Sequence, residues 1–121
     1  MWEVEYYETQ KGKRPAQEFI DNLDAKSKAK IARTIDLLER FGIDLGMPYT
    51  KHIREELWEL RTRVGTNQHR IIYFLFTGKV FILLHGFAKK SGRIPGQELK
   101  IARNRRDDFL SRGGKNELER T

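Results

Sequence analysis

Two apolar runs in the second half of the chain constrain the fold more than any other feature. Residues 71–76 and 80–84 are almost entirely apolar, and Thr77 and Gly78 between them are residues that favour turns. Runs of this length suit β-strands, and strands that are apolar on both sides lie at the centre of a sheet that is covered on both faces. We therefore predict an antiparallel hairpin of two central strands, residues 70–76 and 80–87.

The rest of the chain supplies further strands and three helices. Alternating patterns predict strands at residues 2–6 and 57–64, and residues 42–53 have the composition of a loop. Helical spacing of apolar residues follows Pro15, Asp24 and Pro95, and Gly42 is placed to end the second helix. We expect the first two helices to form a hairpin packed through their apolar stripes.

This order of elements predicts an α+β fold with a small, mostly antiparallel sheet, an N-terminal helical hairpin and a C-terminal helix. A chain of 121 residues can form one hydrophobic core. We assign residues 1–112 to a single domain and residues 113–121 to a flexible tail.

The charge of the chain is concentrated in its second half. The net charge is +7, but residues 1–60 carry 10 basic and 12 acidic groups, whereas residues 61–121 carry 14 and 5. A surface with this excess of Lys and Arg attracts polyanions, because each neutralised phosphate releases counterions. The second half is therefore a candidate nucleic-acid interface. The alternative is an ordinary solvated basic surface, and we expect Lys26, Lys28 and Lys30 to form such a face of the second helix.

Several classes of function are excluded by residues that the sequence lacks. The chain has no cysteine, which rules out disulfides, thiolate nucleophiles and cysteine-ligated metals. Its histidines, His52, His69 and His85, do not have the spacing of metal ligands, so we expect no metal and no cofactor. No apolar run approaches the roughly 20 residues of a membrane-spanning helix, and the acidic N-terminus is unlike a signal peptide. We expect a cytoplasmic protein with no membrane partner.

Three stretches of the sequence resemble a known family. Residues 56–61 read ELWELR, residues 69–74 read HRIIYF, and residues 84–90 read LHGFAKK, followed by Ile94, Pro95 and Glu98. Their order and spacing are similar to those of the HigB-like, phage-derived Gp49-like branch of the RelE/ParE toxins, over residues 2 to about 110. The resemblance implies a RelE-like fold and the toxin of a type II toxin–antitoxin system. Such a toxin is a ribosome-dependent mRNA endoribonuclease, and its implied partners are a helix-turn-helix antitoxin, the ribosome and mRNA.

The match differs from RelE at one strand. RelE carries lysines, one of them thought to act as base, at positions that match Leu57 and Glu59 here. The arginine that opens the next strand is retained as Arg70, and the basic residue after the last central strand is matched by Lys90, with Lys89 beside it.

Metal-independent RNA cleavage uses the 2′-hydroxyl as nucleophile. The protein must then remove the 2′ proton, stabilise a phosphorane and protonate the 5′ oxygen. Guanidinium groups suit the charged intermediate, and an imidazole suits proton transfer near neutral pH. The candidate catalytic residues are Arg61, Arg70, His85, Lys89 and Lys90, with Glu59 as candidate base. The candidate RNA-binding residues are Lys51, Arg63, Tyr73, Arg93, Lys100 and Arg103.

Strand alternation groups some of these residues. It places Glu59, Arg61 and Arg63 on one side of their strand, and His85 with Lys89 on one side of theirs. The same residue types also have structural interpretations. Arg70 could pair with Glu59 across strands, His85 could be a hydrogen-bonded core residue, and Tyr73 could belong to the core.

Two other functions remain open on the sequence. A ParE-like inhibitor of DNA gyrase shares the fold and has no nuclease site, and a basic adaptor would bind nucleic acid without cutting it. A gyrase inhibitor has no need of Arg61, Arg70, His85 and Lys89 around one strand end, so neutralising them should distinguish it from the nuclease.

Overall fold

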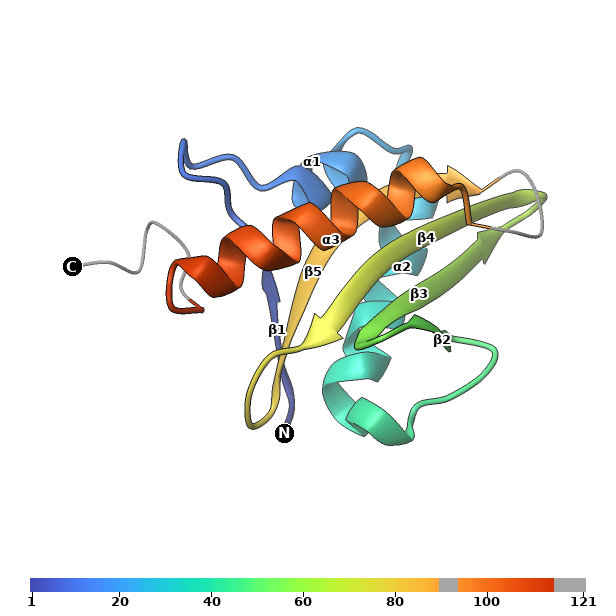
Figure 1. Cartoon of the computed structure of the whole chain (residues 1–121). Coiled ribbons are helices and arrows are strands. Elements are labelled where there is room, and N and C mark those ends of the chain that lie inside the picture. Colours follow the sequence, from blue (N-terminus) through green and yellow to red (C-terminus); the bar gives the residue numbers. More distant parts are fainter. Residues whose placement is uncertain (90–93, 115–121) are drawn as a thin grey trace.

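A five-stranded sheet with helices on both faces forms the protein, as seen in a computed structural model that describes residues 1–89 and 94–114 (Figure 1). The elements in chain order are β1 (Glu3–Tyr6), α1 (Pro15–Asp21), α2 (Ala25–Phe41), the 3-10 helix η1 (Gly42–Asp44), β2 (Thr50–Arg54), β3 (Leu57–Val64), β4 (Asn67–Leu75), β5 (Val80–Lys89) and α3 (Gly96–Ser111). The predicted α+β class is confirmed. Across the described residues, no helix combines the length and the apolar character needed to cross a membrane.

The predicted hairpin lies at the centre of the sheet. The strand order is β1-β5-β4-β3-β2, with β4 and β5 antiparallel and β1 parallel to β5 at one edge. β4 is buried along most of its length, and β5 is buried mainly in its first half. The apolar runs were diagnostic because a strand covered on two faces has no solvent side on which to place polar residues.

A β-bulge in β5 sets the direction of the side chains that follow it. Ile72 pairs with His85 and Tyr73 pairs with Leu83, so Leu84 is the extra residue of β5. Without it, alternation would turn His85 away from α3, whereas the bulge keeps His85 on the same face as Leu84. All later side chains of β5 inherit this shift.

The stretch 42–53, expected to be a loop, contains more regular structure than predicted. It includes η1, and Thr50–Arg54 forms β2, an edge strand antiparallel to the first half of β3. The residues of β2 are mostly polar and exposed. The strand is stabilised by pairing with β3 rather than by its own apolar pattern, and a periodicity argument therefore overlooks it.

The two faces of the sheet have separate apolar cores. Figure 1 shows α3 across one face, and α1 and α2 on the other. On the α3 face, Phe109 packs with residues such as Phe74 and Ile82. On the opposite face, Ile31 and Leu38 of α2 pack with strand residues. The expected helical hairpin is present, but its apolar stripes lie on the sheet, α1 mainly against β5 and α2 mainly against β3, rather than mainly against each other.

Gly86 of β5 allows α1 to approach the sheet closely. A Cβ at this position would lie 2.4 Å from Cδ2 of Phe19. We predict that Gly86→Ala lowers the free energy of unfolding by about 1–3 kcal/mol, because the added methyl group overpacks the core. Urea denaturation measures this change. Gly96→Ala is the control, since nothing lies within 4 Å of the added Cβ, and it should be close to neutral. Equal stability of Gly86→Ala and the wild type would contradict the packing argument.

Candidate functional site

Four charged side chains from three neighbouring strands meet on the α3 face of the sheet. Oε1 of Glu59 lies 3.6 Å from Nε of Arg61, 3.7 Å from Nε of Arg70 and 3.9 Å from Nζ of Lys89. We call these four residues the charge cluster. Three cations share one carboxylate, so the cluster carries a net positive charge of two.

Strand register explains why the cluster forms. Arg61 of β3 pairs with Arg70 of β4, and Gln68 of β4 pairs with Lys89 of β5. Side chains two residues apart share a face, so Glu59 and Arg61 point the same way, as do Arg70 and Gln68. Lys51 of β2 lies opposite Glu59 and adds a further positive charge nearby. The predicted charged face of β3 is therefore real, and β4 and β5 contribute to it.

Most of the charge cluster is buried. The exposed fractions of the side chains are 1% for Glu59, 3% for Arg70, 6% for Lys89 and 26% for Arg61. Burial lowers the pKa of Lys89, Glu59 raises it, and the neighbouring cations lower it further. An ammonium with a lowered pKa gives up its proton more readily than an exposed lysine does.

Arg70 differs in one respect from its expected role. The nuclease interpretation requires a guanidinium that can contact substrate, yet Arg70 is buried and paired with Glu59 across strands, as the structural interpretation proposed. It is not isolated from the other cations, because Lys89 pairs with the same carboxylate oxygen. Its Nη2 donates to Oε1 of Gln68 at 2.5 Å. Among the described residues, neither Nε of Arg70 nor Oε2 of Glu59 has a hydrogen-bond partner.

His85 shares the face of the charge cluster but has different partners. Its Nε2 lies 2.6 Å from Oε1 of Glu98, its Nδ1 lies 3.1 Å from Nη1 of Arg105, and its ring stacks on Phe87. The face that His85 shares with Lys89 was predicted correctly. The contacts of His85 connect β5 to α3, which supports the structural interpretation of this histidine.

The other predicted site residues are dispersed. Tyr73 is buried on the opposite face against Phe81, so the expected stacking on a nucleic-acid base is not available to its ring. Lys100 is exposed on α3, and Arg103 pairs with Glu55 at 3.3 Å. Lys90 and Arg93 lie outside the described residues. Among residues 1–89 and 94–114, no three histidine or carboxylate side chains are grouped to hold a metal ion.

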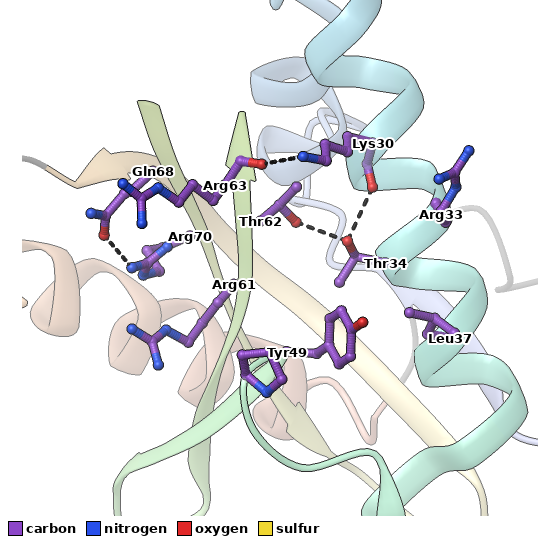
Figure 2. Close-up of a pocket in the computed structure, with 11 residues that line it drawn as sticks. Lys30, Arg33, Thr34, Leu37, Tyr49, Arg61, Thr62, Arg63, Gln68 and Arg70 are labelled. Carbon is purple, nitrogen blue, oxygen red and sulfur yellow. Dashed lines mark hydrogen bonds between the residues drawn. The ribbon is translucent and has the colours of Figure 1, made fainter. Parts of the chain in front are cut away.

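A groove of about 500 Å³ adjoins the charge cluster (Figure 2). It runs along the second half of β3, between that strand and α2. In Figure 2, Arg61, Arg70 and Gln68 lie on one side of β3, while Lys30 and Arg33 approach from α2. We call it the basic groove and define it by Lys30, Arg33, Tyr49, Arg61, Arg63 and Arg70.

Sequence reasoning missed half of the basic groove. It assigned Lys30 to a solvated helix face and gave Arg33 and Tyr49 no role. The spacing of three residues between Lys30 and Arg33, which puts both on one side of a helix, was the available signal. Tyr49 had none, because its position depends on how the 42–49 segment folds back beside β3.

A family model described as phage derived protein Gp49-like (DUF891) matches residues 18–107. The chain belongs to this family. Gp49-like proteins are part of the RelE/ParE-like toxin fold group and are commonly toxin-like, which agrees with the resemblance seen in the sequence. A search of curated proteins finds no match to this chain.

Glu59 of this Gp49-like protein should be essential for stability. We predict that Glu59→Gln lowers the free energy of unfolding by about 3 kcal/mol, because it leaves buried cations without their counter-ion. Chemical denaturation measures this loss. Glu55→Gln removes a carboxylate that is 48% exposed and paired with Arg103, and it should cost less than about 1 kcal/mol. Similar losses for both variants would show that burial of the carboxylate is unimportant.

Two histidines that are buried or largely buried, His69 and His85, should make the fold sensitive to acid. Burial lowers the pKa of both His69 and His85, although Asp24 and Glu98 respectively oppose the shift. Each neutral ring therefore stabilises the fold fully above the unfolded-chain pKa of about 6.5, and this contribution is lost as pH falls through the lower folded-state pKa. The double variant with His69→Gln and His85→Gln should lose less unfolding free energy than the wild type between about pH 8 and about pH 5. Parallel pH profiles would contradict this assignment.

Proposed function

We propose that this protein is the HigB-like toxin of a type II toxin–antitoxin system and cuts mRNA on the ribosome in the cytoplasm. The observation that carries the proposal is the charge cluster, in which three cations around one carboxylate leave two positive charges uncompensated. A phosphodiester passing to a phosphorane gains negative charge, and fixed cations at that point stabilise it. Family membership supports a toxin, and the charge cluster supports an enzyme that acts on a phosphate.

The cleavage proposed here needs no metal. The 2′-hydroxyl releases its proton to water as its oxygen attacks the adjacent phosphorus, a 2′-oxygen–phosphorus bond forms, and the bond from phosphorus to the 5′ oxygen breaks. The products are a cyclic phosphate and a 5′-hydroxyl. Arg61, the most exposed member of the charge cluster, contacts the phosphate, and Arg70 contributes charge from behind it. Lys89, whose pKa is lowered by burial, protonates the departing 5′ oxygen.

Glu59 is assigned a positioning role rather than that of a base. Its side chain is 1% exposed and lies beneath the cations, where a 2′-hydroxyl cannot contact it in this conformation. By holding Arg61, Arg70 and Lys89 through one oxygen, the carboxylate fixes their relative positions. This preorganisation lets the cations stabilise the transition state without first reorienting.

The proposed partners are the ribosome, mRNA and a helix-turn-helix antitoxin. Residues 61–121 carry 14 basic and 5 acidic groups, which suits contact with ribosomal RNA. An antitoxin that inhibits the toxin directly would cover the charge cluster or the basic groove with acidic side chains. Charge complementarity of this kind raises the rate of association and selects the partner.

The test is cleavage of a defined message on programmed ribosomes, followed by mapping of new 5′ ends. Arg61→Ala and Lys89→Met should each lower the cleavage rate by about a hundredfold or more, because each removes charge or a proton donor from the reacting phosphate. Lys11→Ala, at an exposed loop position, should cleave like the wild type.

Circular dichroism of each variant separates lost chemistry from lost folding. If folded Arg61→Ala and Lys89→Met remained toxic while the message stayed intact, the nuclease proposal would be wrong. A protein-binding inhibitor of gyrase with the same fold would then account for the toxicity.

A further inference from the structure

The basic groove extends away from the charge cluster, and apart from Arg61 and Arg70 its residues have no role in the chemistry proposed above. Within the described part of the chain, β2 pairs only with Leu57–Leu60, apart from one hydrogen bond from the Arg61 amide to the Tyr49 carbonyl at 2.7 Å. The second half of β3 therefore forms an edge of the sheet on that side, with α2 beside it. A hydrogen bond of 3.1 Å from Thr62 to Thr34 connects the two walls, and Nζ of Lys30 donates to the carbonyl of Arg63 at 2.8 Å.

The chemistry of the basic groove favours a nucleic acid. Five of its lining residues are cations, and none of its lining residues within the described chain is acidic. Lys30, Arg33 and Arg63 are exposed, so their charges are available to a ligand. Tyr49 is 39% exposed and adds an aromatic ring to the lining of the groove. Cations that follow a backbone, combined with a ring on which a base can stack, are the two elements of single-strand binding.

The shape of the basic groove favours a single strand over a duplex. Proteins read duplexes by inserting a helix, a ribbon or an arm into a groove of the nucleic acid. Here the protein surface is itself concave, with a volume of about 500 Å³, and a hollow of this size admits an unpaired base with its flanking phosphates. An acidic peptide would satisfy the cations but would not require the tyrosine.

We propose that the basic groove binds single-stranded RNA and positions the message beside the charge cluster. Phosphates lie along Arg61 and Arg63 on the sheet side and along Lys30 and Arg33 on the helix side, and a base stacks on Tyr49. Arg61 and Arg70 line the groove and also belong to the charge cluster, so a strand in the groove leads to the reacting phosphate. This positioning role rests on the proposed nuclease function, whereas binding itself does not.

The binding test uses no ribosome and no cleavage. The probe is a fluorescent single-stranded RNA oligonucleotide with 2′-O-methyl groups, which cannot provide the attacking hydroxyl, and its binding is followed by anisotropy at several salt concentrations. Replacing both Lys30 and Arg33 by Glu should weaken binding by about tenfold or more and reduce its salt dependence, because phosphate contacts are lost. The matched control replaces Lys26 and Lys28 by Glu, an identical change of charge at exposed positions of the same helix that do not line the groove.

Tyr49 provides a second, charge-neutral variant. Tyr49→Leu should weaken binding several-fold while leaving its salt dependence unchanged, and Tyr49→Phe should bind like the wild type, because a phenyl ring still stacks. Circular dichroism confirms that the variants are folded.

The outcomes separate this proposal from its alternatives. The Lys30/Arg33 double variant is the groove pair, and the Lys26/Lys28 double variant is the control pair. If both pairs weakened RNA binding equally, the proposal would be overturned, since only overall charge would then matter. Displacement of the probe by poly-glutamate as readily as by unlabelled single-stranded RNA would also overturn it and indicate an acidic protein partner. If the groove pair alone lost binding while wild-type protein failed to cut ribosome-bound message, the groove would stand and the nuclease function would fall. If the groove pair kept wild-type RNA binding while Arg61→Ala lost cleavage, the groove proposal would fall and the nuclease function would stand.

Discussion

The charge cluster depends on one buried carboxylate, that of Glu59. Arg61, Arg70 and Lys89 would repel one another and lose hydration if strand pairing brought them together without an anion, at a cost of several kcal/mol per ion. Glu59 makes the arrangement possible by offering one oxygen to all three. Because a single negative charge cannot neutralise three positive ones, the charge cluster keeps an excess of positive charge, which an anion such as phosphate could neutralise. The same residue therefore makes the buried arrangement possible and leaves its positive charge in excess.

The α3 face combines two polar assemblies with different tasks. His85 contacts Glu98 and Arg105 and so ties α3 to the centre of the sheet. The charge cluster lies further along the same strands, where the described part of α3 makes no ion pair with it. Phe87 stands between the two, stacked on His85 and paired in register with Arg70. The contacts that position α3 and the charge cluster therefore lie near each other on one face, and no hydrogen bond between described residues connects them.

The sequence was most informative where periodicity and burial coincide. Continuous apolar runs identified the central hairpin, and alternation along β3 correctly placed Glu59 and Arg61 on one side. It was least informative where structure depends on a partner. β2 exists because β3 offers it an edge, Tyr49 lines the basic groove because its segment folds back, and Arg33 belongs to the groove because α2 lies on β3. Pattern analysis treats such residues as solvated surface.

Because of the bulge at Leu84, the site depends on the number of residues in β5 as well as on their identity. The one extra residue determines the face of the sheet to which each of the last five side chains of β5 points, and therefore the face on which Lys89 lies. A relative lacking that position would keep every polar side chain at the end of β5 and direct its lysine toward the helical hairpin instead. Within this family, a single-residue gap in an alignment of the last strand is therefore as informative as the loss of the lysine itself.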